Sequence, residues 1–187
     1  MTRLPVARPG VRRDAAGTLV RGLQDRRGAA AIEFALIFPM LFVLIIAAGE
    51  GLQAYIAQRQ VSHIAATMAD ITAQSRVVTI SQVDDILTAS TSMIHPFPTT
   101  SLQQRVASVS ANGSGTVSTD WVQNRGWLGS GNPGIPNGYL AANESVVVAE
   151  VAYDYRPTFG LFMPESIRIT RQAYSRPRLS PKVERTT

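Results

Sequence analysis

A continuous apolar run near the amino end is the strongest pattern in this sequence. Residues 29–49 read AAAIEFALIFPMLFVLIIAAG, and Glu33 is the only charged residue among these 21. A helix of this length spans about 30 Å, the thickness of a bilayer core. A chain of 187 residues has little other sequence with which to surround so apolar a helix. The pattern therefore predicts a transmembrane helix over residues 29–49.

A cleaved secretory signal is the alternative interpretation of the apolar run. The apolar core of such a signal has about 7–15 residues, which is shorter than this run. The small residues Ala47, Ala48 and Gly49 end the run, but an amphipathic segment follows them instead of a polar mature start. The pattern favours a retained anchor.

Beyond Gly49, apolar residues recur at the three-and-four spacing of an amphipathic helix. We expect the helix to continue to about Ser75 and to turn this stripe toward a folded domain. His63 lies on the same segment and is expected at the surface, since no second metal ligand is near it in the sequence. The stripe consists of Leu52, Tyr55, Ile56, Val61, Ile64, Ala65, Met68 and Ile71.

The rest of the chain predicts a second helix and a sheet. Ser81 and Asp84 resemble a capping box at the start of a helix that ends near His95. The apolar period then changes to two, and the turn residues at 112–115 indicate a hairpin. The expected strands are residues 102–110, 116–123, 145–155 and 167–174, with a long loop over 124–143. The sequence thus predicts an α+β, pilin-like fold: a long N-terminal transmembrane helix that continues as an amphipathic helix, packed on a small antiparallel β-sheet.

A short apolar connection joins the last two predicted strands. It contains Phe159, Leu161, Phe162 and Met163 between Arg156 and Pro164. We expect these side chains to touch the membrane surface.

The charge distribution sets the topology. The formal net charge of the chain is +5, and residues 1–28 alone carry seven Arg and two Asp. Residues 29–165 have a net charge of −5, and residues 166–187 a net charge of +5. The body therefore lacks the basic face of a nucleic-acid binder. The positive-inside rule directs the amino end to the cytoplasm and the body to the other side. We expect a basic leader (1–28), a transmembrane helix (29–49), a folded domain (50–178) and a flexible basic tail (179–187).

Residues suited to catalysis or metal binding are scarce. The chain has no Cys and two His, which excludes disulfides, thiolate sites and His-rich metal sites. No Gly-x-Ser-x-Gly elbow is present, and Asp84 and Asp85 point to different helix faces. Glu150 and Asp154 share a strand face and are expected in ion pairs or facing solvent. We expect no enzyme, cofactor, metal or small-molecule substrate.

The junction between the basic leader and the apolar run carries a specific motif. Gly28 is followed by four small or apolar residues, then Glu33 and Phe34. This arrangement resembles the class III signal peptide of type IV pilins, which a membrane prepilin peptidase cuts directly after the Gly. The dodecamer GAAAIEFALIFP, Gly28 to Pro39, resembles the N-terminus of the TadE/TadG family of tight-adherence (Flp-type) pilus assembly proteins. Glu50 also resembles the family pattern.

The resemblance implies a role in pilus assembly. It implies cleavage between Gly28 and Ala29, and subunit pairing or assembly through Glu33, Phe34 and Pro39. Other pilins, pilus-assembly proteins, a prepilin peptidase and the bacterial inner membrane are the implied partners, with the C-terminal domain in the periplasm. The chain would then be a minor pilin-like or assembly component. An uncleaved single-pass scaffold of the cell envelope is the alternative.

Two residues of the apolar run have more than one interpretation. Glu33 lies one turn inside the predicted membrane boundary, where its carboxylate either reaches the headgroups or pairs with a charge. After cleavage, the new α-amino group of Ala29 would lie four residues away and is a candidate for that charge. Pro39 removes one backbone donor and predicts a kink, which is either incidental or a bend for packing.

Overall fold

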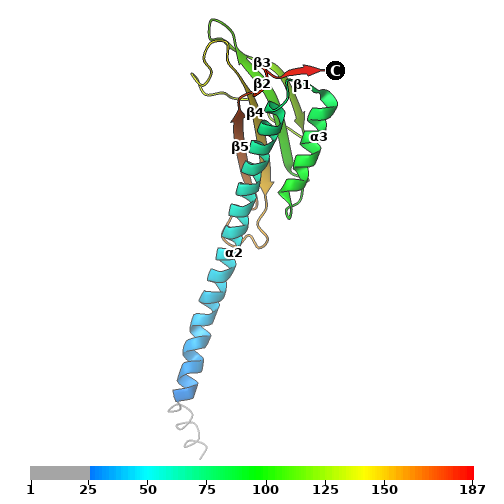
Figure 1. Ribbon diagram of the computed structural model, residues 1–187. Helices are drawn as coiled ribbons and strands as arrows, with labels where there is room; N and C mark the ends of the chain where they lie inside the picture. Colours follow the sequence, from blue (N-terminus) through cyan, green and yellow to red (C-terminus); the bar gives the residue numbers. More distant parts are fainter. Residues whose placement is uncertain (1–25) are drawn as a thin grey trace, which may run out of the picture. The chain divides into compact units, whose positions relative to one another are not determined.

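A computed structural model describes residues 26–187, so that most of the predicted leader, residues 1–28, lies outside the described residues. The chain divides into two compact units, residues 1–46 and 47–187. Helix α2 (Arg26–Ala73) begins in the first unit, continues through Pro39 and ends in the second (Figure 1). The long helix expected from the sequence is therefore confirmed.

The second unit has the predicted α+β composition. Each of the four long strands begins and ends within two residues of its predicted bounds, and no strand interrupts the loop at 126–143. The elements that follow α2 are β1 (Val77–Thr79), α3 (Ile80–Thr91), the 3₁₀ turn η1 (Ser92–Ile94), β2 (Leu102–Ala111), β3 (Val117–Arg125), β4 (Ser145–Tyr155), β5 (Ile167–Ser175) and β6 (Glu184–Thr186).

Four strands form an antiparallel sheet in the order β3-β2-β4-β5. β2 and β3 are the predicted hairpin, with a bulge between Ser108 and Val109. In the centre of the sheet, Arg105 of β2 lies directly opposite Glu150 of β4. This register gives each of the two central strands one face toward the helices and one face away from them.

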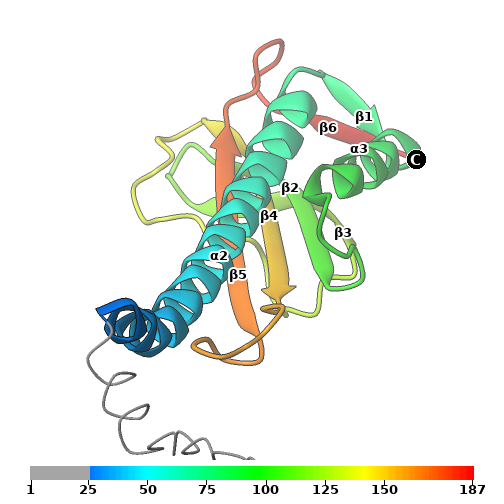
Figure 2. The ribbon, with the colours of Figure 1, turned by 90° about the horizontal axis from the view of Figure 1, so that it is seen from below.

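The helices cover one face of the sheet. Figure 2 shows the second half of α2 crossing β4 and β5, with α3 beside it toward β2 and β3. Residues of β2 and β4 that point to this face, such as Val106 and Val151, are fully buried. They join the α2 residues Val61, Ile64 and Met68 in one hydrophobic core.

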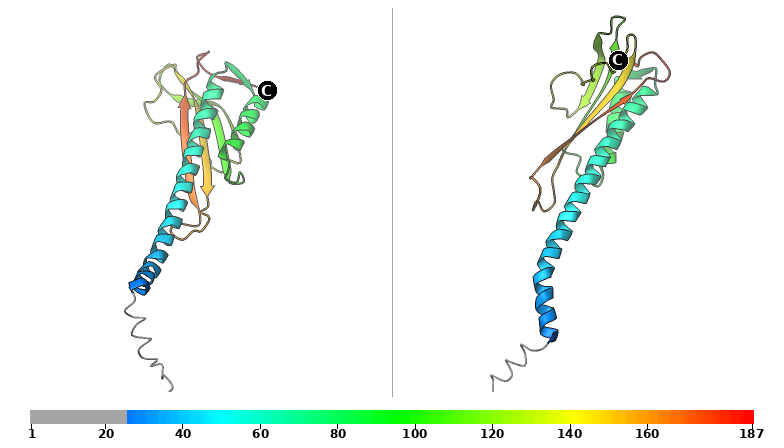
Figure 3. Two further views of the ribbon diagram at one scale, coloured as in Figure 1. Left: turned by 60° about the horizontal axis from the view of Figure 1, so that its bottom comes forward. Right: turned by 90° about the vertical axis from the view of Figure 1, so that its left-hand side faces the viewer.

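The loop at 126–143 covers part of the other face of the sheet, so that the helices and the loop lie on opposite sides (Figure 3). Its Leu140 is buried in a second, smaller cluster with Ala107 and Val148 of the central strands. Ile135 and Tyr174 pack against this cluster. Because both faces are covered, β2 and β4 are buried along almost their whole length.

The cap of α3 differs from the predicted one. Thr79 is the N-cap: its hydroxyl accepts a hydrogen bond from the N–H of Gln82 at 3.1 Å, and Gln82 Oε1 accepts one from the N–H of Thr79 at 2.9 Å. This is a capping box with Gln at the third helical position. The predicted start at Ser81 and Asp84 was wrong, because β1 ends at Thr79 and the helix begins at once.

The amphipathic stripe of α2 begins later than predicted. Val61, Ile64, Ala65 and Met68 are buried as expected. Ile71, at the end of the predicted stripe, is exposed, and so are Leu52, Tyr55 and Ile56 at its start. At 100° per residue these three lie on the side of the helix away from Glu50, Ala57 and Val61, which form the buried face. The prediction that they face the folded domain was wrong.

The C-terminal residues differ from the flexible tail expected over 179–187. Glu184–Thr186 form β6, which pairs in parallel with β1. Val183 is fully buried, and its carbonyl accepts a hydrogen bond of 2.8 Å from Trp121 Nε1. The buried valine and the strand pairing together attach this segment to the folded unit.

Candidate functional site

The five residues singled out in the sequence all lie on α2, and all are exposed. They are Gly28, Ala29, Glu33, Phe34 and Pro39. The bond between Gly28 and Ala29 lies in the first turn of the helix, where helix ends fray most readily. Glu33 follows Ala29 by one helical turn. The structure thus places the two bonded residues and the carboxylate on neighbouring turns of one helix.

An aromatic ladder extends the single phenylalanine that the sequence motif had singled out. Phe34, Phe38 and Phe42 follow one another at i, i+4 spacing along α2. The ring centroids are 5.5 Å apart in the first pair and 6.0 Å apart in the second. The spacing itself was the signal for this ladder, since residues four apart meet on one helix face.

The apolar side chains of the first half of α2 are uncovered. Every large apolar side chain from Ile32 to Ile45 is 43–75% exposed. The helix is long and apolar enough to cross a membrane, and its most apolar 18-residue window is wholly unburied. A continuous apolar surface of this extent marks a membrane or protein interaction site. These observations suggest that the segment anchors the chain in a membrane.

A buried carboxylate lies just beyond the apolar run. Glu50 is 2% exposed, and its Oε1 accepts hydrogen bonds from the N–H groups of Phe159 at 2.8 Å and Gly160 at 2.6 Å. Consecutive N–H groups that converge on one oxygen form an anion-binding concavity. Gly160 has φ +63°, a conformation that favours glycine. Glu50 therefore holds the connection between β4 and β5 against α2.

Glu50 lies between an exposed polar contact and a buried tyrosine. Thr158 Oγ1 donates to Gln53 Oε1 at 3.3 Å, which adds a second contact between the connection and α2. The Tyr155 hydroxyl is buried nearby. Burial first, and then the charge of Glu50 and the neighbouring Tyr153, raise the pKa of Tyr155. The tyrosine therefore remains neutral beside the carboxylate.

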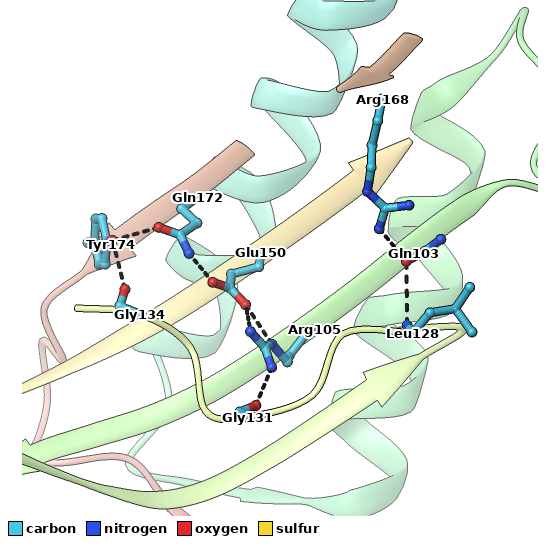
Figure 4. Close-up of polar contacts among 9 residues, drawn as sticks. All are labelled: Gln103, Arg105, Leu128, Gly131, Gly134, Glu150, Arg168, Gln172 and Tyr174. Atoms are coloured by element: carbon cyan, nitrogen blue, oxygen red, sulfur yellow. Dashed lines mark hydrogen bonds and ion pairs between the residues drawn. The ribbon is translucent and has the colours of Figure 1, made fainter. Parts of the chain in front are cut away.

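A second buried carboxylate lies on the outer face of the sheet (Figure 4). Arg105 Nε and Nη2 both donate to Glu150 Oε2, and the two side chains are almost fully buried. Gln172 donates to the other oxygen, Oε1. The sequence interpretation expected an ion pair or solvent exposure for Glu150, and only the ion pair is confirmed. Asp154 is paired as well, with Arg168 at 3.3 Å.

The same network fastens the loop at 126–143 to the sheet. Arg105 Nη1 donates to the carbonyl of Gly131 at 2.6 Å, and its guanidinium lies 4.4 Å from the ring centroid of Trp127. The Tyr174 hydroxyl donates to the carbonyl of Gly134 at 3.0 Å (Figure 4). Gln103 Oε1 accepts from the N–H of Leu128 at 3.4 Å. These contacts hold the loop in one arrangement, with its Leu128 side chain 82% exposed.

Glu144 fixes the end of this loop. Its carboxylate accepts hydrogen bonds from the N–H of Ala141 at 3.0 Å and from Arg176 at 2.7 and 3.0 Å. The backbone hydrogen bond first, and the arginine second, lower the pKa of Glu144. The group is therefore held in its ionised form.

Within residues 26–187, no group of three or more His, Asp or Glu side chains is arranged to hold a metal ion. Asp84 pairs with Arg125 at 2.8 Å, and His63 is exposed. A surface groove of about 320 Å³ between α2 and α3 has mainly apolar walls, including Met68, Ile86 and Met93. The described residues thus present apolar helix surfaces and fastened loops, which suit contacts with lipid and protein.

Comparison with known families matches the region that contains the motif. The family model described as TadE-like protein matches residues 28–70, all of which lie in α2. The matched segment includes the exposed apolar run and the buried residues Val61, Ile64 and Met68. The resemblance expected from the sequence is confirmed for this segment, and it implies a function related to the tight-adherence pilus. No curated protein and no solved structure matches the chain.

Proposed function

We propose that this protein is a minor pilin-like or assembly component of a tight-adherence pilus, anchored in the bacterial inner membrane by α2. The observation that carries the proposal is the TadE-like segment over residues 28–70. This segment begins at Gly28 and contains Glu33, the aromatic ladder and Glu50. It therefore includes both the residues expected for assembly and the helix expected for anchoring.

In the proposed mechanism, the exposed apolar side chains of α2 leave the lipid and pack against neighbouring pilin helices. Before assembly, lipid covers the side chains from Ile32 to Ile45 of the membrane-anchored subunit. Neighbouring pilin helices cover the same side chains when the subunit is extracted into a fibre. The energetic change is small for apolar side chains because both surroundings are apolar, and packing at the aromatic ladder selects the partner.

Glu33 is the residue proposed to make the fibre more stable than the free subunit in the membrane. A carboxylate in an apolar medium is destabilised by a few kcal/mol unless it is paired. Cleavage after Gly28 creates an α-amino group one turn away, within the same subunit or presented to a neighbour. A pair with a neighbouring subunit forms only in the fibre and therefore favours assembly, whereas a pair within one subunit also forms before assembly and favours neither state.

The proposed topology has the amino end in the cytoplasm and residues 50–187 in the periplasm. The seven arginines of residues 1–28 support it through the positive-inside rule. The continuity of α2 through Ala47, Ala48 and Gly49 supports a retained anchor over a cleaved secretory signal. A cut at these residues would remove the first half of a helix whose second half is in the core.

The protein acts through protein contacts rather than catalysis in this proposal. The fastened loop at 126–143 and the exposed edge of the sheet are the surfaces offered to pilus-assembly partners. β3 and β5 are the two edge strands of the four-stranded sheet. An edge strand presents unpaired backbone groups, which is a common way to add a partner strand.

Piliation of cells that carry Glu33 variants tests the pairing role. Glu33→Ala and Glu33→Gln remove the charge, and we expect both to reduce the number of pili while the protein stays in the membrane. Asp85→Ala is the matched control, because it removes an exposed carboxylate from α3. Normal piliation by both Glu33 variants would contradict the pairing role.

The intact mass of the membrane-extracted protein tests cleavage. We expect a species that begins at Ala29 in cells that contain a prepilin peptidase. A species that retains Met1 in such cells favours the alternative, an uncleaved single-pass scaffold of the cell envelope. In the scaffold alternative, Glu33 reaches the headgroups and has no assembly partner.

A further inference from the structure

A cluster of exposed apolar side chains lies on the connection between β4 and β5. Phe159, Leu161 and Phe162 are 59–65% exposed, although they lie within four consecutive residues. Glu50 holds this connection against α2 through the N–H groups of Phe159 and Gly160. These two hydrogen bonds fix the backbone of the connection while its apolar side chains stay exposed. An exposed apolar cluster of this kind marks an interaction site.

The opposite side of α2 is apolar at the same level. Leu52 and Tyr55 are 60% and 62% exposed, and Ile56 is exposed beside them. At 100° per residue, these positions point 140–240° away from Glu50. We call the two groups together the apolar collar: Phe159, Leu161 and Phe162 on the connection, and Leu52, Tyr55 and Ile56 on the helix. The connection half of the collar lies on the Glu50 side of α2, and the helix half lies on the opposite side, within two turns of Glu50.

We propose that the apolar collar inserts into the interfacial layer of the bilayer, and that Glu50 is the positioning residue that presents its loop half to the lipid. The inference rests on the proposed anchoring of residues 29–49. Leu52 and Ile56 follow Gly49 by three and seven residues, or about 5–10 Å along the helix. This is the depth at which the headgroup and interfacial layer follows the hydrocarbon core.

Lipid fits the collar better than a protein partner does. A protein partner covers one side of a helix, whereas a bilayer surrounds it, and the collar has apolar residues on two opposite sides. The residues at its margins are also those of an interface. Tyr55 belongs to the residue types enriched at the headgroup level, and Arg59 follows it by one turn. Exposed Arg156 and Glu165 flank the apolar tip of the connection.

The absence of cysteine from the sequence gives a direct test. Single-cysteine variants of the full chain are labelled with an environment-sensitive nitrobenzoxadiazole group and reconstituted in vesicles of phosphatidylethanolamine and phosphatidylglycerol. Phe162→Cys reports on the collar. Leu44→Cys reports on the membrane helix, and Leu128→Cys, on the fastened loop, is the exposed control. Lipids with nitroxides at the headgroup or in mid-chain then quench each label according to its depth.

We expect a blue-shifted Phe162→Cys label that headgroup nitroxides quench, and a Leu44→Cys label that mid-chain nitroxides quench. The Leu128→Cys label should emit as in water and escape quenching. If Leu44→Cys is quenched and Phe162→Cys behaves like Leu128→Cys, the collar proposal is overturned and the anchor stands. If Leu44→Cys is not quenched, the anchoring itself fails, and the collar proposal fails with it.

The positioning role of Glu50 has its own readout. On the Phe162→Cys background, Glu50→Ala removes the acceptor for the N–H groups of Phe159 and Gly160. We expect headgroup nitroxides to quench the label less, and both amides to lose their protection from hydrogen exchange. Glu50→Gln keeps one acceptor oxygen and should restore part of both signals. Unchanged quenching in Glu50→Ala would overturn the positioning role. Amide exchange of the unsubstituted protein tests it without any variant: rapid exchange at Phe159 and Gly160 would contradict the contact.

Discussion

Replacement of Glu150 by alanine is the most severe single change that we expect in the folded unit. Arg105 is buried, and it donates two N–H groups to Glu150 Oε2 and a third to the carbonyl of Gly131. Without the carboxylate, the guanidinium remains in the same place with no opposite charge. Gln172 loses its acceptor as well.

The expected loss follows from the burial of the pair. Removal of one partner of a buried ion pair costs about 3–5 kcal/mol, because the other charge stays uncompensated. A typical domain is stable by about 5–15 kcal/mol, so the loss is a large fraction of the total. Each kcal/mol lowers the midpoint of thermal unfolding by about 2–4 °C for a chain of this size. We therefore expect Glu150→Ala to lower the midpoint by roughly 10 °C.

Thermal and urea unfolding of the full chain in detergent measure this loss. Asp154→Ala is the matched control on the same strand, because its partner Arg168 is half exposed and 3.3 Å away. An exposed pair is worth about 0–1 kcal/mol, so the control should unfold close to the wild type. Hydrogen exchange at Leu128, whose N–H donates to Gln103 Oε1, should rise in Glu150→Ala, since Arg105 no longer fastens the loop.

A double variant separates the charge from the packing. Arg105→Met combined with Glu150→Leu leaves no unpaired charge, and such replacements of buried pairs are often neutral or stabilising. We expect the double variant to recover most of the stability. If Glu150→Ala costs no more than Asp154→Ala, then the reasoning from a buried, fully paired carboxylate is wrong.

Three further predictions concern the loop and the C-terminal strand. Gly129→Ala should change the fluorescence of Trp127 and loosen the loop, because an added Cβ would lie 2.6 Å from Trp127 Nε1. Hydrogen bonds lower the pKa of Glu144 from 4.5, so they stabilise the fold above that pH and lose this effect as the pH falls through the lowered pKa. Glu144→Gln should therefore be less stable than the wild type at pH 7 and equally stable in acid. Trp121→Phe removes the hydrogen bond to the carbonyl of Val183. In urea unfolding, the free energy of unfolding should fall by about 1 kcal/mol, and limited digestion should cleave β6 faster.

The elements that the sequence predicted well have strong periodicity. The apolar run and the three-and-four spacing that follows it determine α2, and the alternation in 145–155 determines β4. The hairpin follows from the turn residues at 112–115, where Asn112 Oδ1 accepts from the N–H groups of Ser114 at 3.1 Å and Thr116 at 2.8 Å. Each of these signals is local, so no tertiary information is needed.

The parts that the sequence did not predict depend on distant contacts. Glu50 binds backbone groups that are 109 and 110 residues away, and no local pattern encodes that contact. The stripe of α2 was misassigned at Leu52, because apolar residues occupy both the buried side and the collar side there. β6 is three residues long, and both its pairing with β1 and the Trp121 contact with the preceding Val183 join residues far apart in the sequence. One signal was available: opposite charges at the centres of two predicted strands, Arg105 and Glu150, are the pattern of a cross-strand pair.

Exchange of the membrane helix tests the central claim most directly. In a strain that lacks this gene, surface pili are counted by electron microscopy after complementation with the full chain or with a variant whose residues 30–46 are an unrelated apolar helix. Both proteins should be found in the membrane. We expect pili with the full chain and none with the exchanged helix, because in the proposed function the TadE-like segment makes assembly contacts as well as anchoring the chain. Normal piliation with the exchanged helix, or in the strain without the gene, would contradict the account.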